Sequence, residues 1–144
     1  MKKSLVAGLY LALTSVVPAV FAESPAGQQE FTEYCASCHG IDGRGHGPQS
    51  LETGKPPRDL TLLSQANGGS FPYSRVRSVI DGRVERGKNS TAHLRGGMPV
   101  WGDVFVSEKG SSAASQIHGE AVAKMRILNI VDYLVSIQRE DDSI

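Results

Sequence analysis

Apolar residues recur at helical spacing most clearly toward the C-terminal end of the chain. The sequence predicts a helix over residues 120–139, with apolar side chains three or four positions apart at Ile127, Ile130, Val131, Leu134 and Ile137. A shorter segment, residues 73–81, has the same spacing at Val76, Val79 and Ile80. Gly82 follows it as a stop signal. Both segments are typical of helices that bury one face.

A third helix is predicted over residues 26–36. Ser24 is suited to cap its N-terminus, and Pro25 is suited to its first turn. Gly27, Phe31 and Cys35 follow one another at intervals of four, so they share one face of this helix. The buried face of the helix therefore ends at a cysteine.

The segments between these helices are rich in glycine, proline and polar residues. Residues 40–48 contain four glycines, which exclude regular structure and predict a loop that folds close against its neighbours. Pro56-Pro57 predicts an extended segment, and Asp59 is expected to cap a short helix over residues 60–65. Loops are predicted at 67–70, 83–97 and 108–115. No segment alternates as a half-buried strand would, so the expected fold class is all-α.

The first 22 residues resemble an export signal, so we expect that they are not part of the fold. Lys2 and Lys3 form a short positive region, an apolar run follows, and Val20-Phe21-Ala22 is a small-x-small cleavage site. We expect cleavage after Ala22, which leaves one domain over residues 23–144. The alternative is that the segment stays attached as a membrane anchor.

Charge and size exclude several classes of partner. The 144 residues carry 15 basic and 15 acidic side chains. Loss of Lys2 and Lys3 with the signal leaves 13 basic and 15 acidic side chains, a net charge of −2. Nucleic acids and anionic membranes attract clustered positive charge, and no such cluster is present.

The candidate chemistry is concentrated in Cys35-Ala36-Ser37-Cys38-His39, which holds both cysteines of the chain. C-x-x-C-H is the attachment motif of a c-type haem. Two residues between the cysteines let both sulfurs reach one edge of the porphyrin as thioethers, and the histidine becomes an axial ligand of the iron. The alternatives are a thioredoxin-like redox pair, which would follow a strand, and half of a zinc site, which would need a second pair of ligands.

Met98 is the candidate ligand for the opposite side of the iron. A thioether is soft, favours Fe(II) and raises the reduction potential. Two glycines before Met98 allow close backbone approach, and Pro99 stiffens the segment after it. The rival ligands are His93, in the same loop, and His118. His46 follows the proximal ligand too closely to reach the far side, and Met125 is interpreted as a core residue of the last helix.

These motifs together resemble the class I mono-haem c-type cytochromes of the bacterial periplasm. The resemblance rests on the helix that leads into the haem motif, the glycine-rich loop after it, the Met98-Pro99 pair 59 residues beyond His39, and the C-terminal helix. It implies an all-α fold wrapped around one covalent haem c. It also implies that the N- and C-terminal helices cross, with Gly27, Phe31, Ile130 and Tyr133 in contact. The segment formed by residues 108–119 is longer than the corresponding segment in the shortest members of that family.

The resemblance also assigns a role to Pro48, whose carbonyl is expected to accept a hydrogen bond from Nδ1 of His39. Trp101 follows the Met98 segment and is the best-placed candidate to touch the haem edge. Buried propionates need hydrogen-bonding or charged partners. The further candidates for contact with the haem are Arg58, Arg75, Arg83 and Tyr73, although a surface position is the simpler interpretation of each arginine.

The expected function is transfer of single electrons, without enzymatic turnover, because iron with two protein ligands has no site for a substrate. The donor would be a quinol-oxidising complex of the respiratory chain or a dehydrogenase, and the acceptor a terminal oxidase or reductase. An alternative is a dedicated cytochrome subunit of a periplasmic dehydrogenase, with residues 108–119 as a docking element. A third is a haem sensor or peroxidase in which the sixth position is open.

Overall fold

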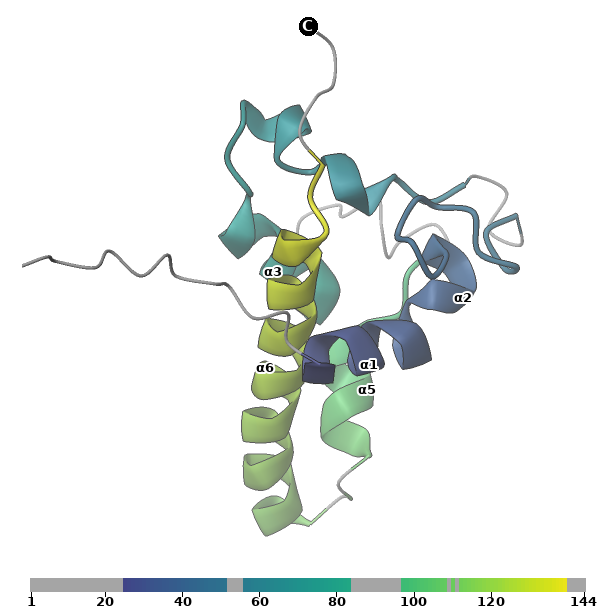
Figure 1. Cartoon of the computed structure of the whole chain (residues 1–144). Helices are drawn as coiled ribbons and strands as arrows, with labels where there is room; N and C mark the ends of the chain where they lie inside the picture. Colours follow the sequence, from purple (N-terminus) through teal and green to yellow (C-terminus); the bar gives the residue numbers. More distant parts are fainter. Residues whose placement is uncertain (1–24, 52–55, 84–96, 109, 111, 140–144) are drawn as a thin grey trace, which may run out of the picture.

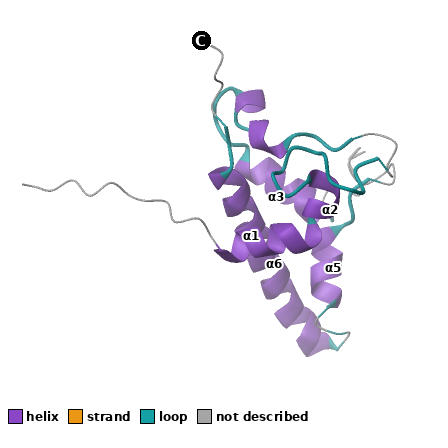
Figure 2. Cartoon of the chain, turned by 45° about the vertical axis from the view of Figure 1, so that its right-hand side comes forward, coloured by secondary structure: helices purple, strands orange, loops and turns teal. Residues whose placement is uncertain are grey.

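The computed structural model describes residues 25–51, 56–83, 97–108, 110 and 112–139 (Figure 1). Within these ranges the elements are helices and loops and no strand occurs, which confirms the predicted all-α class (Figure 2). The elements follow in the order α1 (Pro25–Tyr34), α2 (Ala36–His39), η1 (Leu60–Leu62), η2 (Gln65–Asn67), α3 (Tyr73–Asp81), α5 (Trp101–Ser107) and α6 (Ala113–Ser136). No helix in the described part of the chain is long and apolar enough to cross a lipid bilayer.

The crossing of α1 over α6 is the central contact of the fold (Figures 1 and 2). Gly27 permits it, because a Cβ built there would lie 2.1 Å from the carbonyl oxygen of Asn129. Phe31 is fully buried, and its ring centroid lies 5.2 Å from that of Tyr133. Ile130 is buried in the same cluster. The predicted contact between the two helices is therefore confirmed.

The helix α6 is longer at its N-terminus than the sequence predicts. It begins at Ala113, where a loop and the start of an insertion were expected, and Ser112 caps it by accepting a hydrogen bond from the Ser115 amide at 3.1 Å. Gly119 explains the extension, because it is buried against the backbone of Val106 in α5. Packing against α5 thus stabilises two turns that lack a strong apolar pattern.

The helix α5 itself was not predicted. It has only seven residues, WGDVFVS, and these include a glycine and several residues of low helix propensity. Phe105 is fully buried among the core residues, whereas Trp101 and Val104 are partly buried against them. Tertiary burial therefore outweighs the local preference of this segment.

Other elements match the predictions more closely. The helix α3 has the predicted bounds, and Gly82 ends it in the left-handed conformation with φ 71°. Before α3 in the chain, Asp59 caps η1 as expected, by accepting a hydrogen bond from the Thr61 amide at 2.9 Å. Two short 3-10 helices, η1 and η2, replace the single helix predicted there. The predicted cap Ser24 and most of the 83–97 loop lie outside the described residues.

The core consists of side chains from α1, α3, α5 and α6. The largest fully buried members are Phe31, Phe105, Ile127, Ile130 and Val131. Met125 does not belong to it: this side chain is 64% exposed, so its interpretation as a core residue is wrong. The Met125 side chain lies on the exposed face of α6, and the apolar spacing alone did not show which face of this helix is buried.

Candidate functional site

Cys35 lies between α1 and α2, and Cys38 and His39 lie in the single turn of α2. The helix does not run through to Ala36 as predicted; α1 ends at Tyr34, Cys35 forms a turn, and α2 starts at Ala36. The Cys35 carbonyl accepts hydrogen bonds from the amides of Cys38, at 3.2 Å, and His39, at 2.9 Å. Both cysteines are free thiols. The local fold therefore gathers two sulfurs and an imidazole on one helical turn.

The two sulfurs differ in their surroundings. Cys35 belongs to the buried core cluster, whereas Cys38 is partly exposed. Burial, with a smaller contribution from the negative charge of Glu30, raises the pKa of the Cys35 thiol to about 12. At neutral pH this sulfur stays an uncharged thiol in an apolar environment.

His39 carries a buried polar atom that lacks a partner. Its Nδ1 makes no hydrogen bond, so the predicted hydrogen bond that it would donate to the Pro48 carbonyl is not formed. Burial lowers the pKa of the imidazole, and the nearby backbone of Arg58 opposes this to a smaller extent. The ring is therefore held neutral, and only a neutral imidazole has a lone pair to donate to a metal.

The glycine-rich loop folds back over α2, as its composition predicts. The amides of Gly45 and Gly47 donate to the carbonyls of His39, at 2.7 Å, and Cys38, at 3.1 Å. A Cβ on Gly47 would lie 2.4 Å from the Ser37 carbonyl oxygen, so only glycine fits against the helix there. These contacts fix the backbone around the imidazole, while Pro48 itself is exposed.

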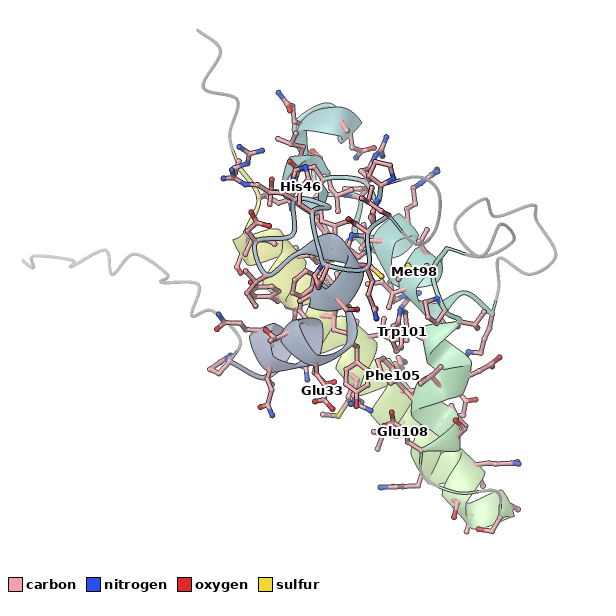
Figure 3. The ribbon with its side chains drawn as sticks, turned by 90° about the vertical axis from the view of Figure 1, so that its right-hand side faces the viewer. Glu33, His46, Met98, Trp101, Phe105 and Glu108 are labelled. Carbon is pink, nitrogen blue, oxygen red and sulfur yellow. The ribbon has the colours of Figure 1, made fainter. Side chains whose placement is uncertain are left out.

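Met98 lies 59 residues beyond His39 in the sequence, but the fold brings its segment close to α2. Figures 1 and 3 both show the segment before α5 running past α2, and Figure 3 labels Met98 on this segment. Met98 is partly buried against the core cluster. Trp101 begins α5 directly after this segment and is also partly buried against the core. The structure thus brings together the two sides of the site that the sequence separates by 59 residues.

An aromatic cluster adjoins the site. The Trp101 ring stacks on Phe105 with centroids 5.5 Å apart and meets Tyr34 edge-on, also at 5.5 Å. Tyr34 and Phe105 were not predicted as site residues. Their signal in the sequence is weak but present, since Tyr34 precedes Cys35 and Phe105 lies one helical turn after Trp101.

Of the rival ligands, only His118 lies in the described residues away from α2 and its glycine-rich loop. His118 is exposed on the first turns of α6, at the end of that helix farthest from α2 (Figures 1 and 2). His46 is exposed on the glycine-rich loop (Figure 3). His93 lies outside the described residues. No group of three or more histidine, cysteine or acidic side chains in the described ranges is arranged to hold a metal ion.

Several candidates for haem contact have other roles. Arg83 forms ion pairs with Asp81 and Glu120, each at 2.7 Å, and so joins the end of α3 to α6. The hydroxyl of Tyr73 donates to Asp132 at 2.8 Å and so joins α3 to α6 at the surface. Arg58 and Arg75 are exposed, as the simpler interpretation expected. The surroundings of these four side chains thus depend on ion pairs, hydrogen bonds and exposure that only the fold sets.

Comparison with known proteins gives one family. A family model described as cytochrome C oxidase, cbb3-type, subunit III matches residues 22–115, which is more than half of the chain. No curated protein and no solved structure matches the chain.

Proposed function

The chain belongs to the family of cbb3-type cytochrome c oxidase subunit III, and from this premise we propose that it is a mono-haem c-type cytochrome that carries single electrons in the periplasm. The family implies a cytochrome c domain with haem-based electron transfer. The number of haems, the axial ligands, the location and the partners are parts of the proposal.

The residues present fit a haem c. Cys35 and Cys38 are free thiols one helical turn apart, which suits two thioether bonds to one porphyrin edge. His39 offers a neutral imidazole, and Met98, which comes from a distant part of the sequence, offers a soft thioether. When bound, haem c supplies one-electron chemistry between ferric and ferrous iron.

The observation that carries the proposal is that the Cys35–His39 turn and the Met98 segment lie side by side (Figures 1 and 3). An imidazole on one side and a thioether on the other would fill both axial positions and leave no coordination site for a substrate. The aromatic cluster of Tyr34, Trp101 and Phe105 supports the same role, because an apolar wall excludes water and favours the less charged ferrous state.

The proposed partners are redox proteins of the respiratory chain. A quinol-oxidising complex or a dehydrogenase would donate the electron, and a terminal oxidase or reductase would accept it. Export would follow from the signal over residues 1–22, which leaves residues 23–144 as the mature domain. Contacts would be brief and small, as is usual for electron-transfer pairs.

A dedicated dehydrogenase subunit is less well supported. That alternative used residues 108–119 as a separate docking insertion. Residues 113–119 are instead the first turns of α6, and Gly119 is packed against Val106 of α5. The segment therefore has a structural role within the domain.

Substitution of Met98→Ala tests the axial assignment in the haem-loaded protein. We expect loss of the weak long-wavelength band that marks a methionine–iron bond in ferric cytochromes, binding of carbon monoxide to the ferrous form, and a reduction potential lower by roughly 100 mV or more. Met125→Ala is the matched control, because Met125 is 64% exposed on α6. A Met98→Ala protein that keeps its band and potential and excludes carbon monoxide would show that another residue is the ligand.

A further inference from the structure

A single arginine of α6 lies where α1 and α5 meet. The Arg126 side chain is only 15% exposed and forms ion pairs with Glu30, at 2.8 Å, and Glu108, at 2.5 Å. Its Nε is within 2.9 Å of both carboxylate oxygens of Glu30, while Nη1 donates to Glu108. The planar guanidinium is suited to binding two carboxylates from different directions, which an ammonium group does less well.

Two aromatic rings cover the same guanidinium. Its central carbon lies 4.6 Å from the ring centroid of Tyr34 and 4.3 Å from that of Phe105. Cations at this distance from a ring are attracted by its negative face, more strongly when water is excluded. Burial alone would lower the pKa of Arg126, but hydrogen bonds to Tyr34, Glu108 and Glu30 outweigh it and raise the pKa. The group is therefore permanently charged and bound on several sides.

The partners of Arg126 belong to the two arms of the site. Glu30 and Tyr34 lie on α1, which ends directly before Cys35. Phe105 and Glu108 lie on α5 and at its C-cap, and the start of α5 directly follows the Met98 segment. The Phe105 ring also stacks on Trp101. Figure 3 shows Met98, Trp101, Phe105 and Glu108 following one another along this side of the molecule.

The other ion pairs of the described residues do not make this connection. Arg44 binds Asp42 within one loop, and Arg139 binds Asp59 at the far end of α6. Arg83 joins α3 to α6. Of these four arginines, Arg126 is the one that binds both α1 and α5.

We propose that Arg126 is a positioning residue that holds α5, and with it Met98, against the Cys35–His39 turn, and so sets how firmly Met98 binds the iron. This inference rests on the proposed function, since it requires Met98 to be the axial ligand. Its physical basis is that α5 is short and has little helical preference of its own, so its position depends on tertiary contacts. If those contacts weaken, the methionine arm can move while the covalent cysteine arm cannot.

The test uses the haem-loaded protein with Arg126→Met, which keeps most of the side-chain length but removes the charge and the hydrogen bonds. We expect ferric protein to bind imidazole, a competitor of Met98, about tenfold more tightly than the unsubstituted protein, with a weaker methionine–iron band and a lower reduction potential. Arg126→Lys keeps the charge without the planar fork and should fall between the two. Glu108→Gln, which removes only the α5 carboxylate, should change the same properties less and folds even if Arg126→Met does not.

A matched control separates positioning from stability. Val131 is fully buried in α6 and is not a partner of Arg126, so Val131→Ala should lower the free energy of unfolding without changing imidazole affinity or potential. Equal stability losses in Arg126→Met and Val131→Ala, with imidazole affinity and potential unchanged in both, would overturn the proposal. If the unsubstituted protein lacks the methionine–iron band, Met98 is not the axial ligand, and both the proposed function and this inference are wrong.

Discussion

The two arms of the site are held in different ways. The cysteine arm, residues 35–50, is closed by its own backbone: the amides of Gly45, Gly47 and Gln49 donate to carbonyls of the Cys-x-x-Cys-His turn at 2.7–3.1 Å. The methionine arm, residues 97–100, leads into α5, whose Asp103 and Val104 amides donate to the Val100 carbonyl. Its position comes from side chains of α1, α3 and α6, which are remote in sequence.

This difference indicates which arm is the more easily displaced. Contacts between residues a few positions apart can form without the rest of the fold, whereas contacts between distant helices are lost when those helices separate. We therefore expect the cysteine arm to be rigid and the methionine arm to respond to packing. Three substitutions test this comparison, in order of decreasing effect on stability.

The largest effect is expected for Gly47→Ala in the cysteine arm. The new methyl group would lie 2.4 Å from the Ser37 carbonyl oxygen and 2.6 Å from that of Ala36, and backbone cannot move aside as a side chain can. The free energy of unfolding should fall by about 3 kcal/mol, measured by urea denaturation of the haem-loaded protein.

Gly68→Ala is the control for this substitution. Gly68 has a left-handed φ of 70°, but a methyl group there meets nothing within 4 Å. Only the conformational cost remains, about 1 kcal/mol. Equal losses in the two variants would mean that the loop does not approach α2 as closely as described.

A smaller loss of stability is expected for Gly102→Ala in the methionine arm. Here the new methyl group meets side-chain atoms, Nε of Arg83 at 2.4 Å and Oδ1 of Asp81 at 2.7 Å, and these can shift. We expect a loss of about 1 kcal/mol. Because Gly102 follows Trp101 at the start of α5, imidazole should nevertheless bind the ferric protein more tightly than in the Gly47→Ala variant. The reverse order of imidazole affinities would contradict the comparison of the two arms.

The smallest effect concerns pH and the ion pair that supports the methionine arm. The hydrogen bond from Arg83, opposed in part by burial, lowers the pKa of Asp81 below its usual value. A carboxylate with a lowered pKa stabilises the fold above its unfolded pKa of about 3.9, and this contribution is lost as the pH falls through the folded value. Asp81→Asn should therefore cost about 0.5 kcal/mol at pH 7, and the difference from the unsubstituted protein should shrink below about pH 4.

Urea denaturation of both proteins from about pH 3 to about pH 7, on either side of the usual carboxyl pKa of about 3.9, measures this difference. Ser74→Ala, on the exposed side of α3, is a suitable control, since its stability should follow that of the unsubstituted protein at each pH. A constant gap between Asp81→Asn and the unsubstituted protein over the whole range would show that the Asp81 charge contributes nothing.

The predictions from sequence succeeded where one local signal was strong. The helix α3 was bounded by its apolar spacing and Gly82, and the crossing of α1 and α6 followed from the spacing of Gly27 and Phe31 together with the family resemblance. They failed for α5 and for the first turns of α6, which are polar or weakly helical and are stabilised by each other at Gly119 and Val106.

The candidate site divides in the same manner. The Cys35–His39 turn and its glycine loop were located from sequence because their chemistry and spacing are contiguous. The core position of Met125 was wrong, since the buried face of α6 depends on distant helices, and the predicted Pro48 hydrogen bond is not formed. Arg126 carried no signal at all in the sequence.

By itself, the sequence determined the helical class, the haem motif and the limits of α3, because these depend on residues within a few positions of one another. The tertiary structure alone decided that α5 is a helix, that Met98 lies beside α2, and that Arg126 joins α1 to α5. Each of these arises from burial and charge pairing between segments far apart in the chain, which no local pattern records.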